Sequence, residues 1–255
     1  MKQLRVLVDE RSPEARQDAL ERAREQPTAR LLLDQAVAPL RRLARRLAED
    51  PDAAPLEELW PALDEAYAAL DRYLGHLLER SGVTPRCGAG CPACCTAAPT
   101  ILPIEGLRMA RALRRRDDGQ ARLLRAAQQS SLFHALLQRA LARSDADARE
   151  VYLETQLRWR ARGMPCPALD DDGRCAAYES RPLACRAYVS VEEPARCLPS
   201  DPAFVGARRP LLWRSDAEAR FEALLSELGD ALELPRALNL LLALPRLFDH
   251  PALDA

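Results

Sequence analysis

The sequence has 255 residues, of which 48% are hydrophobic and 29% are charged, and its formal net charge is −1. This composition is typical of a globular protein that buries a core, as one large domain or two small ones. A net charge so close to zero excludes a strong general attraction to nucleic acid or to an anionic membrane, so we expect neither as a partner.

No stretch of the sequence is typical of a secretory signal or a membrane span. Charged residues interrupt the apolar ones in 1–10, whereas a signal needs about 7–15 continuous apolar residues. The most apolar later stretch, 238–244, is far shorter than the roughly 18 residues of a span. We therefore expect a cytoplasmic protein. Because the cytosol is reducing and discourages structural disulfides, the eight cysteines indicate metal binding.

Helical periodicity dominates the chain outside the cysteines. Ser12-Pro13-Glu14 opens the first expected helix, and a second spans 28–47 with a kink at Pro39. In 56–80 apolar residues recur at steps of three and four, which predicts one amphipathic helix that ends at Gly82. Further helices are expected over 104–116, 121–143 and 147–162, after the capping-box spacing of 215–218, and after Pro235.

Strand signals are almost absent. We therefore predict a mainly α fold, in which a helical scaffold holds irregular cysteine-rich metal-binding loops with little or no sheet. The cysteines divide the chain into an N-terminal helical region (1–84), a cysteine-cluster metal-binding domain (85–200) and a C-terminal helical region (201–255). We expect the three regions to form one compact unit.

The first cysteine group lies within nine residues and comprises Cys87, Cys91, Cys94 and Cys95. The glycines and the proline between these cysteines predict a tight loop, in which backbone N–H groups can turn toward anionic sulfur. Because Cys94 and Cys95 are adjacent, we expect their side chains to point in different directions. They could then serve two neighbouring metals, or one metal and a partner loop.

The second cysteine group is spread over a longer stretch and comprises Cys166, Cys175, Cys185 and Cys197. The segment 166–175 contains an Asp-Gly pair and predicts a short hairpin that brings its two end cysteines together. Two groups of four thiols match the ligands of two four-coordinate centres, either tetrahedral zinc or cubane clusters. The alternatives are disulfides, if the compartment is oxidising, and for an isolated cysteine a buried apolar role.

The segment between the last two cysteines is compact, polar and aromatic. Pro182 fixes its own backbone torsion and disfavours helix at Arg181, so we expect the chain to turn before Cys185. Arg181 and Arg186 could donate charge-assisted hydrogen bonds to backbone carbonyls or toward the anionic centre. Tyr178 and Tyr188 are expected to pack over the site, and the alternative is a surface turn with solvated arginines.

The spacing of these residues is similar to that of a known family. The run Cys-x3-Cys-x2-Cys-Cys, then Cys-x8-Cys and Tyr-x2-Arg-Pro-x2-Cys-Arg-x-Tyr, resembles the YkgJ-like cysteine-cluster family, which is described as a zinc- or iron-chelating domain. The resemblance covers residues 85–200, with Cys197 as the trailing cysteine. The chain departs from the family at Ala177, where a bulkier aliphatic residue is usual, and this change leaves every candidate ligand in place.

Three functions are compatible with the sequence. The preferred one is a protein that binds an iron–sulfur cluster or zinc in a structural or electron-transfer role. Cys-Pro pairs, the crowded first loop and the lack of a histidine ligand favour the cluster over zinc by a small margin. The second is an enzyme that uses the cluster, because the spacing of Cys87, Cys91 and Cys94 is that of radical S-adenosylmethionine enzymes, and flagellin lysine methylases carry a similar cysteine cluster. The third is a zinc-stabilised interaction module.

Overall fold

The computed structural model describes residues 11–49, 56–198, 200–201, 212–213, 218–236 and 239–253. Within these ranges the chain is helical, and its only β-type pairing is an isolated bridge between Leu169 and Cys175. The predicted mainly α fold with little or no sheet is therefore confirmed. The α-helices are α1 (Pro13–Arg24), α2 (Pro27–Glu49), α3 (Leu56–Ser81), α4 (Pro103–Arg114), α5 (Gly119–Leu141), α6 (Ala148–Arg160), α7 (Leu183–Ala187), α8 (Ala219–Ala231) and α9 (Leu240–Leu247), and the 3-10 helices are η1 (Tyr178–Ser180), η2 (Pro194–Cys197) and η4 (Pro251–Leu253).

The expected helices agree with the observed ones to within a few residues. The Ser12 hydroxyl accepts a hydrogen bond from the Ala15 amide at 3.2 Å, which caps α1. α3 ends at Gly82, whose φ of +65° suits glycine. α2 continues through Pro39, so the proline does not end the helix, and the kink stays a prediction. The expected capping box at 215–218 lies mostly outside the described residues.

The chain folds into two compact units, each assembled from several stretches of sequence. Unit 1 comprises Met1–Gly88, Arg186–Cys197 and Ala203–Leu224. Unit 2 comprises Ala89–Cys185, Leu198–Pro202 and Leu225–Ala255. The structure groups the residues differently from the expected regions 1–84, 85–200 and 201–255, and that division stays a prediction.

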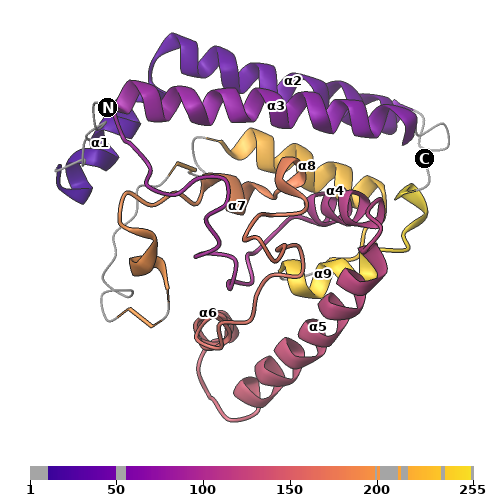
Figure 1. Cartoon of the computed structure of the whole chain (residues 1–255). Helices are drawn as coiled ribbons and strands as arrows, with labels where there is room; N and C mark the ends of the chain where they lie inside the picture. The colour runs from indigo at the N-terminus through magenta and orange to yellow at the C-terminus, as the bar shows by residue number, and fades with distance from the viewer. Residues whose placement is uncertain are drawn as a thin grey trace. The chain divides into compact units, whose positions relative to one another are not determined.

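The central feature of unit 1 is the helix pair α2–α3. The two helices lie side by side (Figure 1), and they run in opposite directions, because Arg46 pairs with Glu58 and Arg42, one turn earlier, pairs with Glu65. The face between them is apolar, and its fully buried residues include Val37, Leu40, Leu63, Leu70 and Leu77. α1 packs against α3. Burial of this apolar stripe accounts for the stability of the pair.

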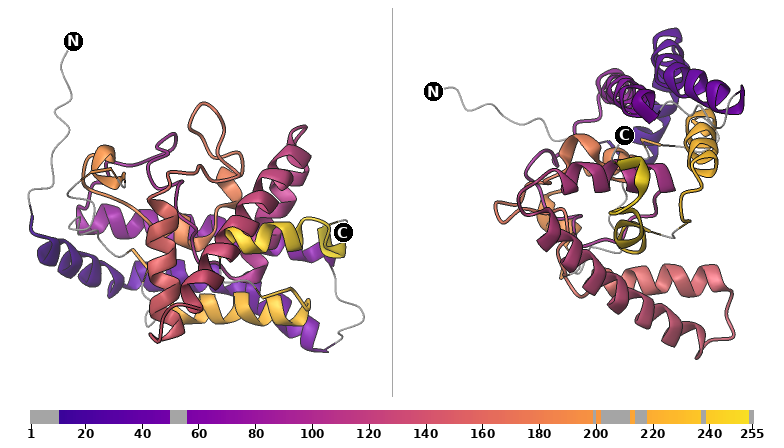
Figure 2. Two further views of the ribbon diagram at one scale, coloured as in Figure 1. Left: turned by 90° about the horizontal axis from the view of Figure 1, so that it is seen from below. Right: turned by 90° about the vertical axis from the view of Figure 1, so that its right-hand side faces the viewer.

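Unit 2 is built around α5, which contacts α4, α6 and α9. α5 and α6 form a helical hairpin (Figure 2, right). The rings of Phe133 on α5 and Trp159 on α6 meet edge to face with centroids 5.6 Å apart. Leu241 and Leu242 of α9 join the same core. Gly106 allows α4 and α9 to approach closely, because a Cβ there would lie 2.7 Å from the Cδ1 of Leu247.

None of the helices that the structure describes is both long and apolar enough to cross a membrane.

Candidate metal centre

Unit 2 contains six of the eight cysteines, on three segments. The first segment is the loop that carries Cys91, Cys94 and Cys95. Two successive turns shape it, since the Cys95 amide donates to the Pro92 carbonyl at 2.8 Å and the Ala97 amide to the Cys94 carbonyl at 3.0 Å. Gly90 has a φ of +86°, which is the conformation that the expected glycine-rich loop needs.

The second segment is the turn between Cys166 and Cys175. The Asp170 amide donates to the Arg174 carbonyl at 2.7 Å and the Gly173 amide to the Asp170 carbonyl at 3.0 Å, which closes the hairpin-like turn. Gly173, with a φ of +81°, supplies the left-handed residue. The expected hairpin with its Asp-Gly turn is therefore present.

The two segments touch although 70 residues lie between them in sequence. The Cys166 amide donates to the Cys95 carbonyl at 2.6 Å. A Cβ on Gly173 would lie 3.6 Å from the Gly90 carbonyl oxygen and from Pro92. The backbone thus places the second cysteine segment directly against the first.

The third segment is the short helix α7, which carries Cys185. Its first amide, that of Leu183, donates to Oε1 of Glu105 on α4 at 2.6 Å. Glu105 is 3% exposed, and its other oxygen accepts from the Leu102 amide at 2.9 Å. One buried carboxylate therefore caps both α4 and α7 and holds Cys185 against the scaffold.

Five thiols of unit 2 lie close enough to affect one another's ionisation. The pKa of Cys95 is raised above its ordinary range, first by a side-chain hydrogen bond with Cys94, then by burial and by the charges of Cys94, Cys166 and Cys185. The pKa of Cys185 is raised by burial and then by Cys166, Cys94 and Cys175. Burial raises the pKa of Cys166 to about 12, with the charges of Cys175 and Cys94 adding to the effect and the Ala168 amide and Arg122 opposing it. The structure thus brings together Cys94, Cys95, Cys166, Cys175 and Cys185.

The contact between Cys94 and Cys95 corrects one expectation. Adjacent residues were expected to point apart, but their side chains share a hydrogen bond. Both residues lie in the overlapping turns of the loop, where successive side chains are not forced onto opposite sides as in a strand. The two thiols can therefore serve the same centre.

Two of these sulfurs accept hydrogen bonds from backbone amides. The Ala168 amide donates to the Cys166 sulfur, and the Ala177 amide donates to the Cys175 sulfur. In each case the donor lies two residues after the cysteine. Such amide bonds stabilise the anionic sulfur that a metal requires, and they tune the properties of the bound metal.

Cys87 and Cys197 belong to unit 1. The Ser190 amide donates to the Cys87 sulfur at 3.0 Å, and the neighbouring Arg86 amide donates to the Ser190 carbonyl at 2.8 Å. Cys197, at the end of η2, is 4% exposed. Cys91 lies in the first loop of unit 2 and is partly exposed. The assignment of all eight cysteines to metal stays a prediction.

The donor set fits a cation in its chemistry. None of the eight cysteines, all of which the structure describes, is paired in a disulfide. A cation among the thiols of unit 2 would offset the burial and mutual repulsion that raise their pKa values. Across the described residues, which include all eight cysteines, no three Cys, His, Asp or Glu side chains are arranged to hold a metal ion. The backbone therefore gathers the thiols, and binding requires them to turn toward a common point.

The four residues expected around the centre differ in their surroundings. Arg181 donates through Nε to the Tyr178 carbonyl at 2.9 Å, and its guanidinium lies 3.5 Å from the centre of the Tyr178 ring. Its charge is among those that lower the pKa of Cys175 against the larger effect of burial. Arg186 instead pairs with Asp71 of α3 and lies over the Tyr67 ring. Tyr188 is 37% exposed.

Sequence reasoning missed the buried polar residues that attach the cysteine segments to the helices. Besides Glu105, these are Arg108, which donates to the Glu179 carbonyl at 2.7 Å, and Arg122, which donates to the carbonyls of Pro167 and Leu169. Arg122 occupies the same helical face as Ala126, Phe133 and Leu137. A charged residue within such an apolar stripe was the available signal, because a buried charge needs partners.

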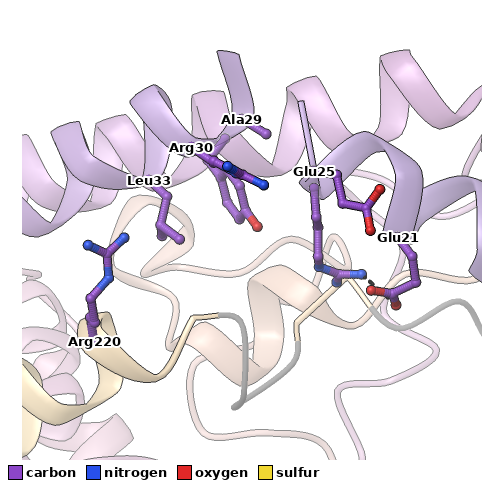
Figure 3. Close-up of a pocket in the computed structure, with 8 residues that line it drawn as sticks. Glu21, Glu25, Ala29, Arg30, Leu33 and Arg220 are labelled. Carbon is purple, nitrogen blue, oxygen red and sulfur yellow. Dashed lines mark hydrogen bonds and ion pairs between the residues drawn. The ribbon is translucent and has the colours of Figure 1, made fainter. Parts of the chain in front are cut away.

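A separate polar pocket of about 350 Å³ lies in unit 1 (Figure 3). Beside it, Glu218 is fully buried and accepts from the Tyr73 hydroxyl at 2.6 Å and from Nε of Arg24 at 3.0 Å. Burial and then the bond to Glu218 raise the pKa of Tyr73 above its ordinary range. Arg220, which also lines the pocket, pairs with Asp34 at 2.9 Å. These charges pair within the protein, so the network serves to hold unit 1 together.

One family comparison matches the cysteine-bearing part of the chain. Residues 86–204 match the CxxCxxCC family, described as a "putative zinc- or iron-chelating domain". No curated protein and no solved structure matches the chain. The match spans all eight cysteines and agrees with the resemblance noted from the sequence.

Proposed function

Because residues 86–204 match the CxxCxxCC family of zinc- or iron-chelating domains, we propose that the thiolates of unit 2 hold an iron–sulfur cluster that ties the three cysteine segments together. The observation that carries this proposal is the approach of five thiols from three segments, none of them in a disulfide. Cubane and binuclear clusters are held by four thiolates, so the segments supply enough ligands for one cluster.

The preference for iron–sulfur over zinc is supported by the composition of the site. Its candidate ligands are all cysteines, and two of the six cysteines of unit 2 are adjacent. Amide hydrogen bonds to the sulfurs of Cys166 and Cys175 are also found around iron–sulfur clusters. When bound, the cluster would supply a redox-active, net anionic centre, and this chain's own residues would orient the sulfurs and limit access of water to them.

The proposal is tested on protein purified without oxygen. We expect a coloured protein whose iron and sulfide contents match a cluster, and a colourless protein with bound zinc would assign the site to zinc instead. Absence of both metals from protein supplied with each would contradict the proposal.

Single substitutions test which thiols take part. Cys166→Ser removes a sulfur from the five-thiol group and should abolish metal binding by unit 2. Cys197→Ser is the matched control, because Cys197 belongs to unit 1, and it should leave at least one centre per chain. Equal metal content in the two variants would show that the five-thiol group is not the centre.

A further inference from the structure

Arg122 uses its full hydrogen-bonding capacity at one place in unit 2. A guanidinium has five N–H donors. Nε and Nη2 of Arg122 donate to Asp118 at 2.9 and 2.6 Å, and Nη2 also donates to Asp170. Nη1 donates to the carbonyls of Pro167 and Leu169 at 3.1 and 3.2 Å. The residue is 5% exposed. Every donor therefore has a partner. Two of the five bonds join α5 to Asp118 at its own N-terminus, and three join it to the segment that starts at Cys166.

One of these bonds bears directly on a candidate ligand. The Pro167 carbonyl and the Ala168 amide belong to the same planar peptide group, in which C=O and N–H point in opposite directions. Arg122 binds the oxygen of this group, and the Ala168 amide donates to the Cys166 sulfur. The cation at one end of the peptide and the sulfur at the other are thus linked through one rigid dipole.

We propose that Arg122 is a positioning residue for Cys166, which fixes the peptide between Pro167 and Ala168 so that its amide points at the sulfur that binds metal. The effect of Arg122 on a bound metal rests on the proposed function. Its effect on the order of the segment that carries Cys166 holds for the metal-free protein as well. Asp118 and Asp170 hold the guanidinium in place, and the Leu169 carbonyl provides the second contact with the same segment. The positive charge also polarises the peptide and strengthens the hydrogen bond that its amide donates to sulfur.

The first test measures hydrogen exchange in the metal-free protein. Arg122→Lys keeps the charge but loses the planar fork, so it cannot satisfy the five acceptor contacts. We expect amide exchange in 164–176 to become about tenfold faster, the change that corresponds to about 1.4 kcal/mol of local stability. The control is Arg125→Lys, an exposed position on the same helix, which should leave exchange unchanged. Unchanged exchange in a folded Arg122→Lys protein would overturn the inference, whatever the protein binds.

The second test measures the bound centre. In Arg122→Lys the charge remains but the amide is no longer held in its orientation, which should make the reduction potential of a cluster more negative. In a zinc site examined with cobalt as the probe, the sulfur-to-metal absorption should shift. A variant that binds metal with the wild-type potential or spectrum would overturn the positioning role. A wild-type protein that binds neither metal would instead overturn the proposed function, and the exchange experiment separates the two failures.

A milder pair of variants covers the case in which Arg122→Lys fails to fold. Asp170→Asn weakens one partner of Arg122 from the surface side of the turn, and it should accelerate exchange in 164–176 by a smaller factor. Asp172→Asn is the matched control in the same turn, because Asp172 accepts from the Arg174 amide and is exposed. Equal exchange in the two aspartate variants would overturn the inference.

Discussion

The helix pair α2–α3 and the cysteine segments of unit 2 are stabilised in different ways. The pair buries a continuous apolar stripe, with Val37, Leu40 and Leu63 fully inaccessible. The cysteine segments contain little regular structure, and side chains of α4 and α5 hold them through their backbone groups. A stripe of leucines needs only its partner helix, whereas each loop depends on a few specific polar contacts and on its thiols.

Because of this difference, metal should affect the stability of the cysteine segments and not that of α2–α3. Apolar burial stabilises by roughly 25 cal/mol per Å², and it is independent of metal. In the cysteine segments the raised pKa values show that the gathered thiols resist ionisation without a cation. Gathering these thiols therefore lowers the folding stability of the cysteine segments in the metal-free protein, and metal binding should restore it.

The largest expected effect is that of metal removal. Chelation of the metal should expose 89–97 and 164–185 to protease and to hydrogen exchange, because the free energy of metal binding is then free energy of folding. Hydrogen exchange of α2–α3 should change little. Exchange mapped by mass spectrometry, before and after chelation, measures both regions in one sample.

Two outcomes would break the comparison between the regions. Equal protection of the cysteine segments with and without metal would show that the polar contacts alone suffice. Concerted loss of protection in α2–α3 would show that the two units unfold as one cooperative structure.

The next largest effect is expected at Glu105. Glu105→Ala removes the acceptor of two backbone amides, those of Leu102 and Leu183, and one of them is buried. We expect a loss of about 2–3 kcal/mol in the free energy of unfolding of unit 2, with α7 the most affected element. Chemical denaturation of the metal-free protein measures this loss.

The control for Glu105 is Glu154→Ala. Glu154 makes an exposed ion pair with Arg158 on α6, and such a pair contributes only about 0.3–0.5 kcal/mol. Similar losses in the two variants would contradict the role assigned to Glu105.

Much of the helical scaffold was predictable from the sequence, whereas the contacts of the loops were not. The boundaries of α1 and α3 follow from local signals, namely the Ser12 cap, the apolar period and Gly82. The hairpin-like turn before Cys175 follows from its Asp-Gly pair.

The attachment of the loops depends on residues that are distant in sequence. Glu105 and Leu183 are 78 positions apart, and Arg122 and Pro167 are 45 apart. A single sequence shows that Arg122 lies in an apolar stripe, but not which carbonyls it meets. The partner of Arg186 was unexpected for the same reason, since Asp71 lies 115 positions away on α3.

A smaller effect is expected when the pH is raised. Cys166 has a folded pKa of about 12 against an ordinary value of 9.0, so the folded metal-free protein holds this proton more tightly than the unfolded chain. The contribution of this thiol to folding stability is complete below pH 9.0, its ordinary pKa, and is lost as the pH rises from there toward 12. Protease cleavage within 164–185 should therefore stay constant up to about pH 9 and increase above it, while α2–α3 stays protected.

Bound metal should abolish this dependence on pH. In the loaded protein the sulfurs are already deprotonated, so the same rise in pH should not increase cleavage in 164–185. If cleavage of the metal-free protein fell with rising pH, the assignment of buried neutral thiols would be wrong.

The smallest expected effect is that of Arg181→Lys, which tests whether this arginine acts through its shape or only its charge. The guanidinium lies over the Tyr178 ring, and its Nε donates to the Tyr178 carbonyl, a combination that the single ammonium of lysine reproduces poorly. Although burial raises the pKa of Cys175, the charge of Arg181 lowers it, and lysine would keep much of that charge. We expect metal affinity to fall about fivefold, which corresponds to about 1 kcal/mol for the lost stacking and hydrogen bond.

Arg143→Lys, at an exposed position just after α5, is the control and should bind metal like the wild type. If both variants bind equally, charge alone explains the contribution of Arg181, and the cysteine segments depend on fewer specific contacts than the structure implies.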